Sequence, residues 1–215
     1  MQKIRILAAL TATVVWVSLA LQLVLLARMF GPAEGTWRFL GFFTSLSNIG
    51  IAVIATTAAM GGVTGLIGPR ARFMALTAIL AVGLVYSVLL RSLWNPTGLQ
   101  RLAGIGLHDA APVMFATLWA MMPHGELRWR DLRWALAPPA LYLAYACLRG
   151  SIDGWYPYTF LDPRLQGPGG VLAGIAAVLA IFAIVGAAVI AVDARLPNRR
   201  QPRSSPLAID HCEAR

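Results

Sequence analysis

Three polar side chains lie inside otherwise apolar stretches of this chain. Thr44 and Asn48 are in one stretch, and His108 is in another. Polar and ionisable groups are costly in a hydrocarbon environment unless they have partners, so a histidine in such a stretch indicates a functional site. A hydroxyl beside an imidazole suits nucleophilic catalysis, because the ring can accept the proton of the attacking alcohol.

The elements that position these groups are membrane helices. Of 215 residues, 58% are hydrophobic and only 13% are charged, which is too apolar for a soluble domain. A helix needs about 20 apolar residues to cross the hydrocarbon layer. The sequence therefore predicts an all-α polytopic bundle of six transmembrane helices, at 4–27, 38–60, 73–93, 102–122, 132–149 and 169–192. The first run is longer than the apolar core of a secretory signal, so we expect it to be retained.

The distribution of charge predicts the orientation. Twelve of the 18 Lys and Arg residues fall at one end of the predicted bundle and six at the other, which predicts a multi-pass cell-membrane protein with both termini cytoplasmic. The transmembrane domain spans 1–193. A basic, proline-rich tail, 194–215, is expected to be disordered. Because the net charge of +9 lies along membrane edges and in this tail, we expect membrane lipids rather than nucleic acid as partners.

Two predicted helices bring the polar groups to a common depth. In the predicted orientation, the helices over 38–60 and 102–122 both begin at the outer side of the membrane. Thr44 then lies about 9 Å deeper in the membrane than Arg38, and His108 lies about 10 Å deeper than the start of its own helix. Thr44, Ser47 and Asn48 share one helix face because they are three and four residues apart. The sequence therefore predicts one site formed from both helices.

Residues near His108 could orient its ring. Pro112 removes a backbone donor, which exposes a carbonyl that could accept a hydrogen bond from the ring. Asp109 is turned about 100° from His108 on a regular helix, so it would face the ring only if the helix distorts. The alternative ion-pair partners of Asp109 are Arg91, Arg101 and Arg149.

The last outer loop, 150–168, is rich in aromatic residues, and we expect it to fold back as a lid that admits an acyl chain. The candidate substrate or oxyanion residues are Ser47, Asn48, Asp109, Tyr86, Arg149, Trp155, Tyr156 and Tyr158. Simpler roles exist for several of them, since Thr, Ser and Asn often bond helix carbonyls or join helices, and tyrosines anchor at interfaces. No cluster with metal-ligand spacing and no phosphate-binding loop occurs, so we expect no metal and no cofactor.

Three segments resemble a family of bacterial six-span membrane proteins, the Pr-six-Pr family. They are 42–48 (FFTSLSN), Leu107-His108 with Pro112, and 145–162 (YACLRGSIDGWYPYTFLD). The resemblance covers nearly the whole chain in order. More distantly, the chain is similar to the eukaryotic androgen-induced membrane proteins, which hydrolyse fatty acid esters of hydroxy fatty acids with a threonine and a histidine.

This resemblance implies a lipid-ester hydrolase with Thr44 as nucleophile and His108 as base; Ser45 or Ser47 could be the aligned hydroxyl instead. An acyl-threonine intermediate would form, with Asn48 or a backbone amide stabilising the oxyanion. The alternative is a non-catalytic membrane protein that binds or transports a lipid or small molecule. A Thr44 hydroxyl within hydrogen-bond reach of the His108 ring, beside an acyl-sized cavity, would favour catalysis.

Overall fold

The computed structural model describes residues 2–62, 65–91 and 95–196, and within these ranges the chain is helical without any strand. The longer helices are α1 (Gln2–Phe30), α2 (Pro32–Gly41), α3 (Phe43–Ala59), α4 (Pro69–Val85), α5 (Gly98–Ile105), α6 (Ala111–Ala120), α7 (Leu132–Asp153) and α8 (Pro163–Arg195). Short turns of helix are η1 (Gly65–Ile67), η2 (Tyr86–Leu90), η3 (Gly106–Ala110), η4 (Trp129–Asp131) and η5 (Thr159–Leu161). The predicted all-α class is confirmed.

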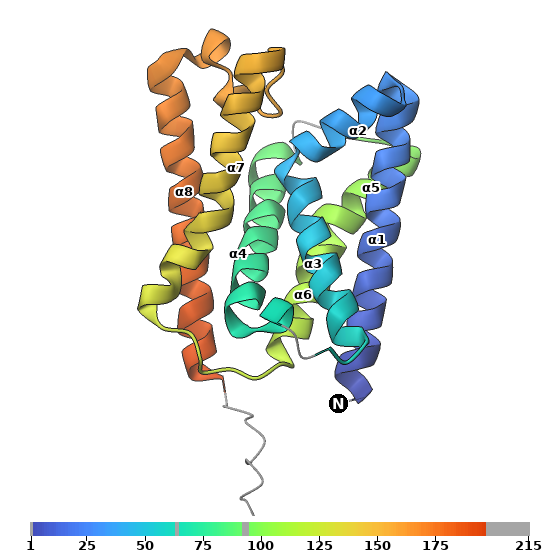
Figure 1. Cartoon of the computed structure of the whole chain (residues 1–215), viewed down its shortest axis with the longest axis vertical. Helices are drawn as coiled ribbons and strands as arrows, with labels where there is room; N and C mark the ends of the chain where they lie inside the picture. The colour runs from blue at the N-terminus through green and yellow to red at the C-terminus, as the bar shows by residue number, and fades with distance from the viewer. Residues whose placement is uncertain (1, 63–64, 92–94, 197–215) are drawn as a thin grey trace, which may run out of the picture.

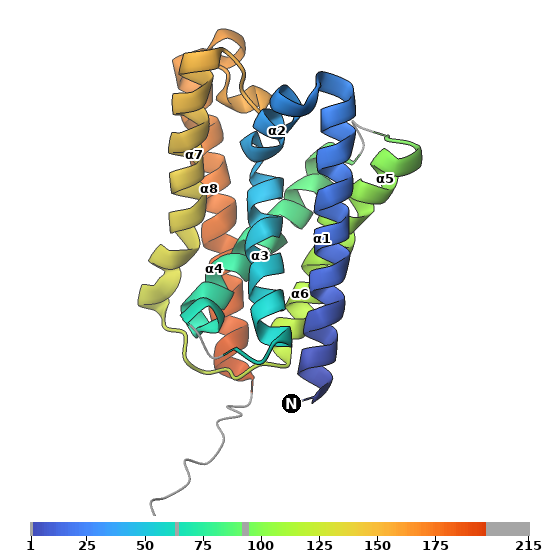
Figure 2. The same cartoon turned by 45° about the vertical axis from the view of Figure 1, so that its right-hand side comes forward.

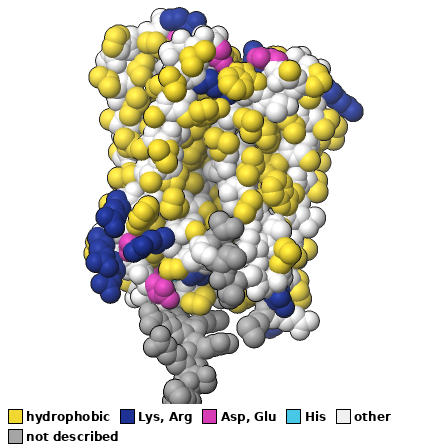
Figure 3. Space-filling view, viewed as in Figure 1, with side chains coloured by type: hydrophobic (Ala, Val, Ile, Leu, Met, Phe, Trp, Pro, Cys, Tyr) yellow, Lys and Arg dark blue, Asp and Glu magenta, His cyan; other side chains and the backbone are white. Residues whose placement is uncertain are grey.

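The molecule has the surface and helices of a membrane protein. Three helices, α1, α4 and α8, are long and apolar enough to cross a membrane, and α2 with α3 makes a fourth if the bent pair is one span. Figure 3 shows apolar side chains over the middle of one face and charged side chains near its two ends. The other two predicted spans correspond to α7 and to the continuous helical stretch 98–120, which is about 35 Å long.

The prediction of one straight helix over 38–60 is wrong. The chain is extended at Phe42, and α2 meets α3 at an angle of 80°. Figure 1 shows α2 lying across the end of the bundle. Gly35 permits this crossing, because a Cβ there would lie 2.6 Å from the backbone of Ala27 on α1. Thr44 is therefore the second residue of α3, and its depth cannot be counted along a straight helix from Arg38.

The helices pack as two groups joined by α4. Figures 1 and 2 both show α7 and α8 side by side, with α4 between this pair and the group formed by α1, α3, α5 and α6. The interior is filled by large apolar side chains that are at most 1% exposed: Val15, Ile51, Phe73, Leu76, Ile79, Phe115 and Leu118. This core holds α3, which carries Thr44, against the 98–120 stretch, which carries His108.

Both described ends of the chain lie at the same end of the bundle (Figure 1). There the segment after α6 is attached to α8 by a buried pair, in which His124 Nδ1 lies 3.1 Å from Asp193 Oδ1. The other oxygen of Asp193 accepts from the backbone N–H groups of Gly125 and Leu127. Helix α8 continues to Arg195, so the first two residues of the tail predicted to be disordered, 194–215, are helical. The part of that tail from residue 197 onward lies outside the described residues.

Candidate functional site

His108 lies in a widened helical turn. In η3 the backbone N–H of Ala111 bonds to the carbonyl of Gly106, five residues earlier, and η2 has the same π-type spacing. Such turns occur often at functional sites. The two turns face each other, because the His108 ring stacks on the Tyr86 ring with 4.1 Å between centroids and 19° between planes. Tyr86, a predicted site residue, is therefore brought to His108.

The His108 ring is oriented by its own helix. Its Nδ1 lies 3.0 Å from the carbonyl oxygen of Gly104. Since a carbonyl can only accept, Nδ1 carries a proton, and in the neutral ring Nε2 keeps a free lone pair. We expected a carbonyl freed by Pro112 to hold the ring. The structure corrects this, because the acceptor belongs to Gly104, one turn before His108.

The carbonyl that is freed belongs to Leu107. Ala111 N bonds to the Gly106 carbonyl five residues earlier. With the same spacing, the Leu107 carbonyl would accept from the N–H of residue 112, but Pro112 has no N–H. Asn48 Nδ2 supplies the donor at 3.3 Å and also donates to the Thr44 carbonyl at 2.8 Å. Asn48 is fully buried. It therefore joins α3 to η3, and both of its N–H groups are used, which leaves none for the oxyanion role that the sequence suggested.

Thr44 is the most accessible hydroxyl on its turn. It is half-buried, whereas Ser45 and Ser47 are buried and the Ser47 hydroxyl donates to the Thr44 carbonyl at 3.1 Å. The Thr44 side chain lies beside the phenol of Tyr158 from the outer loop. Over the described ranges no hydrogen bond joins the Thr44 hydroxyl to His108. The structure thus brings the two helical turns together but does not pair their functional groups.

Asp109 does not orient His108. Its carboxylate forms an ion pair with Arg91, one of the three partners that the sequence offered. The Arg91 guanidinium also lies over the Tyr86 ring, 5.3 Å from its centroid. Asp109 and Arg91 therefore border the stacked rings of His108 and Tyr86.

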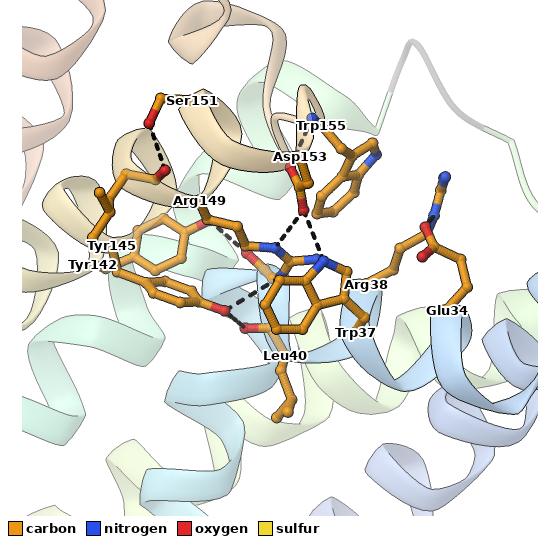
Figure 4. A network of polar contacts seen from close by, with 12 residues as sticks. Glu34, Trp37, Arg38, Leu40, Tyr142, Tyr145, Arg149, Ser151, Asp153 and Trp155 are labelled. Carbon is orange, nitrogen blue, oxygen red and sulfur yellow. Dashed lines mark hydrogen bonds and ion pairs between the residues drawn. The ribbon is translucent and has the colours of Figure 1, made fainter.

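Arg149 is enclosed by protein side chains. Its guanidinium lies 3.9 Å from the centroid of Trp37 and 4.9 Å from that of Trp155, and the residue is 3% exposed. Asp153 accepts from Arg149 Nε at 3.3 Å and from the Trp37 indole at 2.7 Å, as Figure 4 shows. The Arg149 guanidinium also contacts the Tyr145 hydroxyl. These contacts attach α2 to α7, so Arg149 and Trp155 have a structural role in this conformation rather than an open substrate-binding one.

The outer loop packs on the break between α2 and α3. Trp155 contacts Phe42 edge-on, with 5.5 Å between ring centroids, and Tyr158 lies 6.2 Å from the rings of both Phe42 and Tyr142. The Tyr156 ring lies against Gly150. The loop therefore folds back over the start of α3, the position expected of a lid.

An apolar groove of about 640 Å³ runs between α3, α4 and α7. Its lining comes from one face of each helix: Phe43, Leu46, Ser47, Gly50, Val53 and Ile54 on α3, Ala71, Met74, Ala75 and Ala78 on α4, and Pro138, Leu141, Tyr142 and Tyr145 on α7. The groove exists because Gly50 and three alanines are too small to fill the space between the helices. Its lining begins beside Thr44, at Phe43 and Ser47.

A comparison with family models, with curated proteins and with solved structures finds no match for this chain. In the described part of the chain, no group of three or more His, Cys, Asp and Glu side chains could hold a metal ion. The geometry of the groove and of the two π turns is therefore the basis for a proposed function.

Proposed function

We propose that the protein is a multi-pass cell-membrane protein that binds the acyl chain of an ester lipid in the groove between α3, α4 and α7. The observation that supports this most is the groove itself. Its volume of about 640 Å³ lies within the range of small-molecule sites, and its lining is almost entirely apolar. A lipid acyl chain is the ligand that matches such a lining inside a membrane.

The proposed topology has six crossings. The stretch 98–120 and α7 complete the set begun by α1, the α2–α3 pair, α4 and α8. Both termini face the cytoplasm, because the end of the bundle that carries them has the larger share of Lys and Arg. In this orientation the outer loop and Thr44 lie at the extracytoplasmic side.

The groove has a polar end suited to an ester group. Ser47, Tyr142 and Tyr145 are the lining residues with hydroxyl groups, and Tyr142 and Tyr145 donate to carbonyls at the end of α2. The remaining lining is apolar. An acyl chain that follows α3 toward Ile54 would therefore place its ester near Thr44, where the hydroxyls gather.

Filling the groove tests the binding. A Cβ at Gly50 would meet no atom within 4 Å, so Gly50→Leu can extend into the open space without a clash at Cβ. Gly169→Leu is a matched control, since Gly169 is equally open but lies on α8 away from the groove. Mass spectrometry of the purified protein should show loss of co-purified acyl lipid in Gly50→Leu only. Equal lipid retention by both variants would contradict the proposal.

Hydrolysis of the bound ester is a second candidate. It is favoured by the free Nε2 of His108, which leaves a ring nitrogen able to act as base, and by Asn48, which connects the Thr44 turn to η3. In the absence of a Thr44–His108 hydrogen bond, a shift that closes the pair on substrate binding is required. Active-site hydrogen bonds often tighten only in the substrate complex.

The proposed reaction needs only the Thr44 hydroxyl, the His108 ring, the ester and water. The Thr44 oxygen bonds to the ester carbonyl carbon while its proton passes to His108 Nε2. The C–O bond to the alcohol then breaks, and that alcohol takes the proton from His108. Water attacks the acyl-Thr44 with the ring again accepting a proton, which returns to the Thr44 oxygen as the fatty acid leaves.

A further inference from the structure

The groove between α3, α4 and α7 has a limited length. Its polar end lies at Phe43 and Ser47, and on α3 its lining stops at Ile54. Phe43 and Ile54 are 11 residues apart, so the groove extends about 16 Å along α3. An extended chain of single bonds advances about 1.2 Å per bond, since the three bonds of one extended residue span at most about 3.6 Å. The groove therefore has room for an extended acyl chain of about 14 carbons.

A large side chain lies at the inner end of the groove, the end away from the outer loop. On α7 the lining begins at Pro138, and Trp134 is one helical turn before it on the same face. The Trp134 ring is directed toward the start of α4, because the Arg70 guanidinium lies 5.8 Å from its centroid. Arg70 directly precedes Ala71, the innermost lining residue on α4. Trp134 also packs on the apolar core, as does Ile67. The indole therefore lies at the inner end of the groove, between α7 and α4.

A charged hollow of about 410 Å³ lies beyond this end. Of the described residues, Ala71 alone lines both this hollow and the groove. The other residues of the hollow come from the start of α4 and from the segment before α7, and five of them are charged: Arg70, Glu126, Arg128, Arg130 and Asp131. An acyl chain that continued past Ala71 would therefore exchange an apolar lining for a charged one, which is unfavourable for each methylene group.

The end of a longer chain has one other route. Helices α3 and α7 pack on α4 rather than on each other, and Leu141 on the rim of the groove is 73% exposed. The groove is therefore open along its side to the surrounding membrane, and the end of a long chain can bend out there. Bending out loses the contacts of the last methylene groups with the lining but keeps those of the others. The groove therefore prefers chains that fit its length without excluding longer ones.

We propose that Trp134 determines the chain length that the groove prefers, at about 14 carbons. This inference rests on the proposed lipid binding and adds the class of ligand, an ester lipid whose chains have about this length. Trp134 acts by closing the space beyond Pro138, at the opposite end of the groove from the ester.

Lipids that differ only in chain length provide the test. The full-length protein is reconstituted in vesicles with equal amounts of three phosphatidylcholines, whose saturated chains have about 10, about 14 or about 18 carbons. The lipids that it retains after purification are counted by native mass spectrometry. The wild-type protein should retain the middle lipid about threefold better than the longest, because only the contacts of the last few methylene groups differ. Retention that increases steadily with chain length would overturn the proposal.

Variants at the inner end should shift this preference in opposite directions. Trp134→Ala opens the end of the groove, so the longest lipid should be retained as well as the middle one. Ala71→Leu fills the same end from α4, so the shortest lipid should become the preferred one; this variant tests the proposal even if Trp134→Ala does not fold. Trp129→Ala is the matched control, since it removes a 66% exposed indole outside the groove lining and should leave the preference unchanged.

The outcomes separate this inference from the proposed function. If the wild-type protein, Trp134→Ala and Ala71→Leu all retain lipid with the same dependence on chain length, the role of Trp134 is overturned and lipid binding still stands. If the wild-type protein retains none of the three lipids, lipid binding is contradicted and the length preference with it.

Discussion

The Asn48 carboxamide donates to the carbonyl of Leu107, an oxygen that its own helix leaves without a donor. The π spacing uses Ala111 N for Gly106, and Pro112 has no N–H. The buried Asn48 amide on α3 therefore supplies the donor that the widened turn η3 lacks. This pair explains why polar residues from the second and fourth predicted spans lie at the same depth.

Removing this amide should destabilise the protein through Leu107. We expect Asn48→Ala to lower the free energy of unfolding by about 1–2 kcal/mol, since a buried carbonyl loses its donor. Unfolding in mixed micelles followed by tryptophan fluorescence measures this. Ser47→Ala is the control and should cost less, because the Thr44 carbonyl that accepts from Ser47 also accepts from Asn48.

Restoring the missing backbone donor should compensate. Pro112→Ala returns an N–H near the Leu107 carbonyl, so the cost of Asn48→Ala should be smaller in this background than in the wild type. The double-mutant cycle reports this difference directly. Additive effects of the two substitutions would show that Asn48 does not compensate for the proline.

The enclosed site of Arg149 should not accept a lysine in place of the arginine. Arg149→Lys keeps the charge but loses the planar group between Trp37 and Trp155, with an expected cost of about 1–2 kcal/mol. Chymotrypsin should then cleave the outer loop, which carries Trp155, Tyr156 and Tyr158, faster than in the wild type. Arg101→Lys, at an exposed position on α5, is the control; equal cleavage of the two variants would contradict the structural role of Arg149.

The stability of the first turn of α8 should depend on pH. Hydrogen bonds from Arg164 lower the pKa of Asp162 below its ordinary value of 3.8, and the carboxylate caps α8 by accepting from Arg164 N at 2.9 Å. A lowered folded-state pKa contributes stability that is present above 3.8 and lost as the pH falls through the folded value. Hydrogen exchange in the first turn of α8 should accelerate over that window. Asp162→Asn should remove the pH dependence.

The hydrolase candidate predicts a specific pattern of loss. Thr44→Ala and His108→Ala should each abolish hydrolysis of long-chain esters, and labelling by a serine-hydrolase-type phosphonate should vanish with Thr44. Ser47→Ala should retain both, because that hydroxyl is buried and bonded to the helix. Full turnover in the Thr44 and His108 variants would leave lipid binding as the function.

The sequence predicted the helical class and most helix positions, because the position and length of each apolar run are visible in the sequence without knowledge of tertiary contacts. It could not predict the break at Phe42, since the 80° bend depends on contacts with distant residues, Trp155 on Phe42 and α2 on α1. It also placed Asn48 correctly beside the fourth predicted span but left its role open. The hydrogen bond to Leu107 depends on a π turn that the spacing does not reveal.

Two features were missed because they arise between helices. The groove depends on small residues from α3 and α4 facing α7, and no single stretch of sequence shows which faces meet. The pair of His124 and Asp193 joins residues 69 positions apart. Asp193, a carboxylate at the end of an apolar run, was the only sign in the sequence that such a partner was needed.

The acyl chain itself provides the most direct test of the proposed function. A phospholipid with a diazirine on its acyl chain, irradiated in membranes that contain the protein, should label groove residues such as Val53, Met74 and Leu141. Peptide mass spectrometry locates the sites, and excess unlabelled lipid should reduce labelling there selectively. Labelling confined to exposed positions away from the groove, such as Val17 and Ile184, would contradict the account.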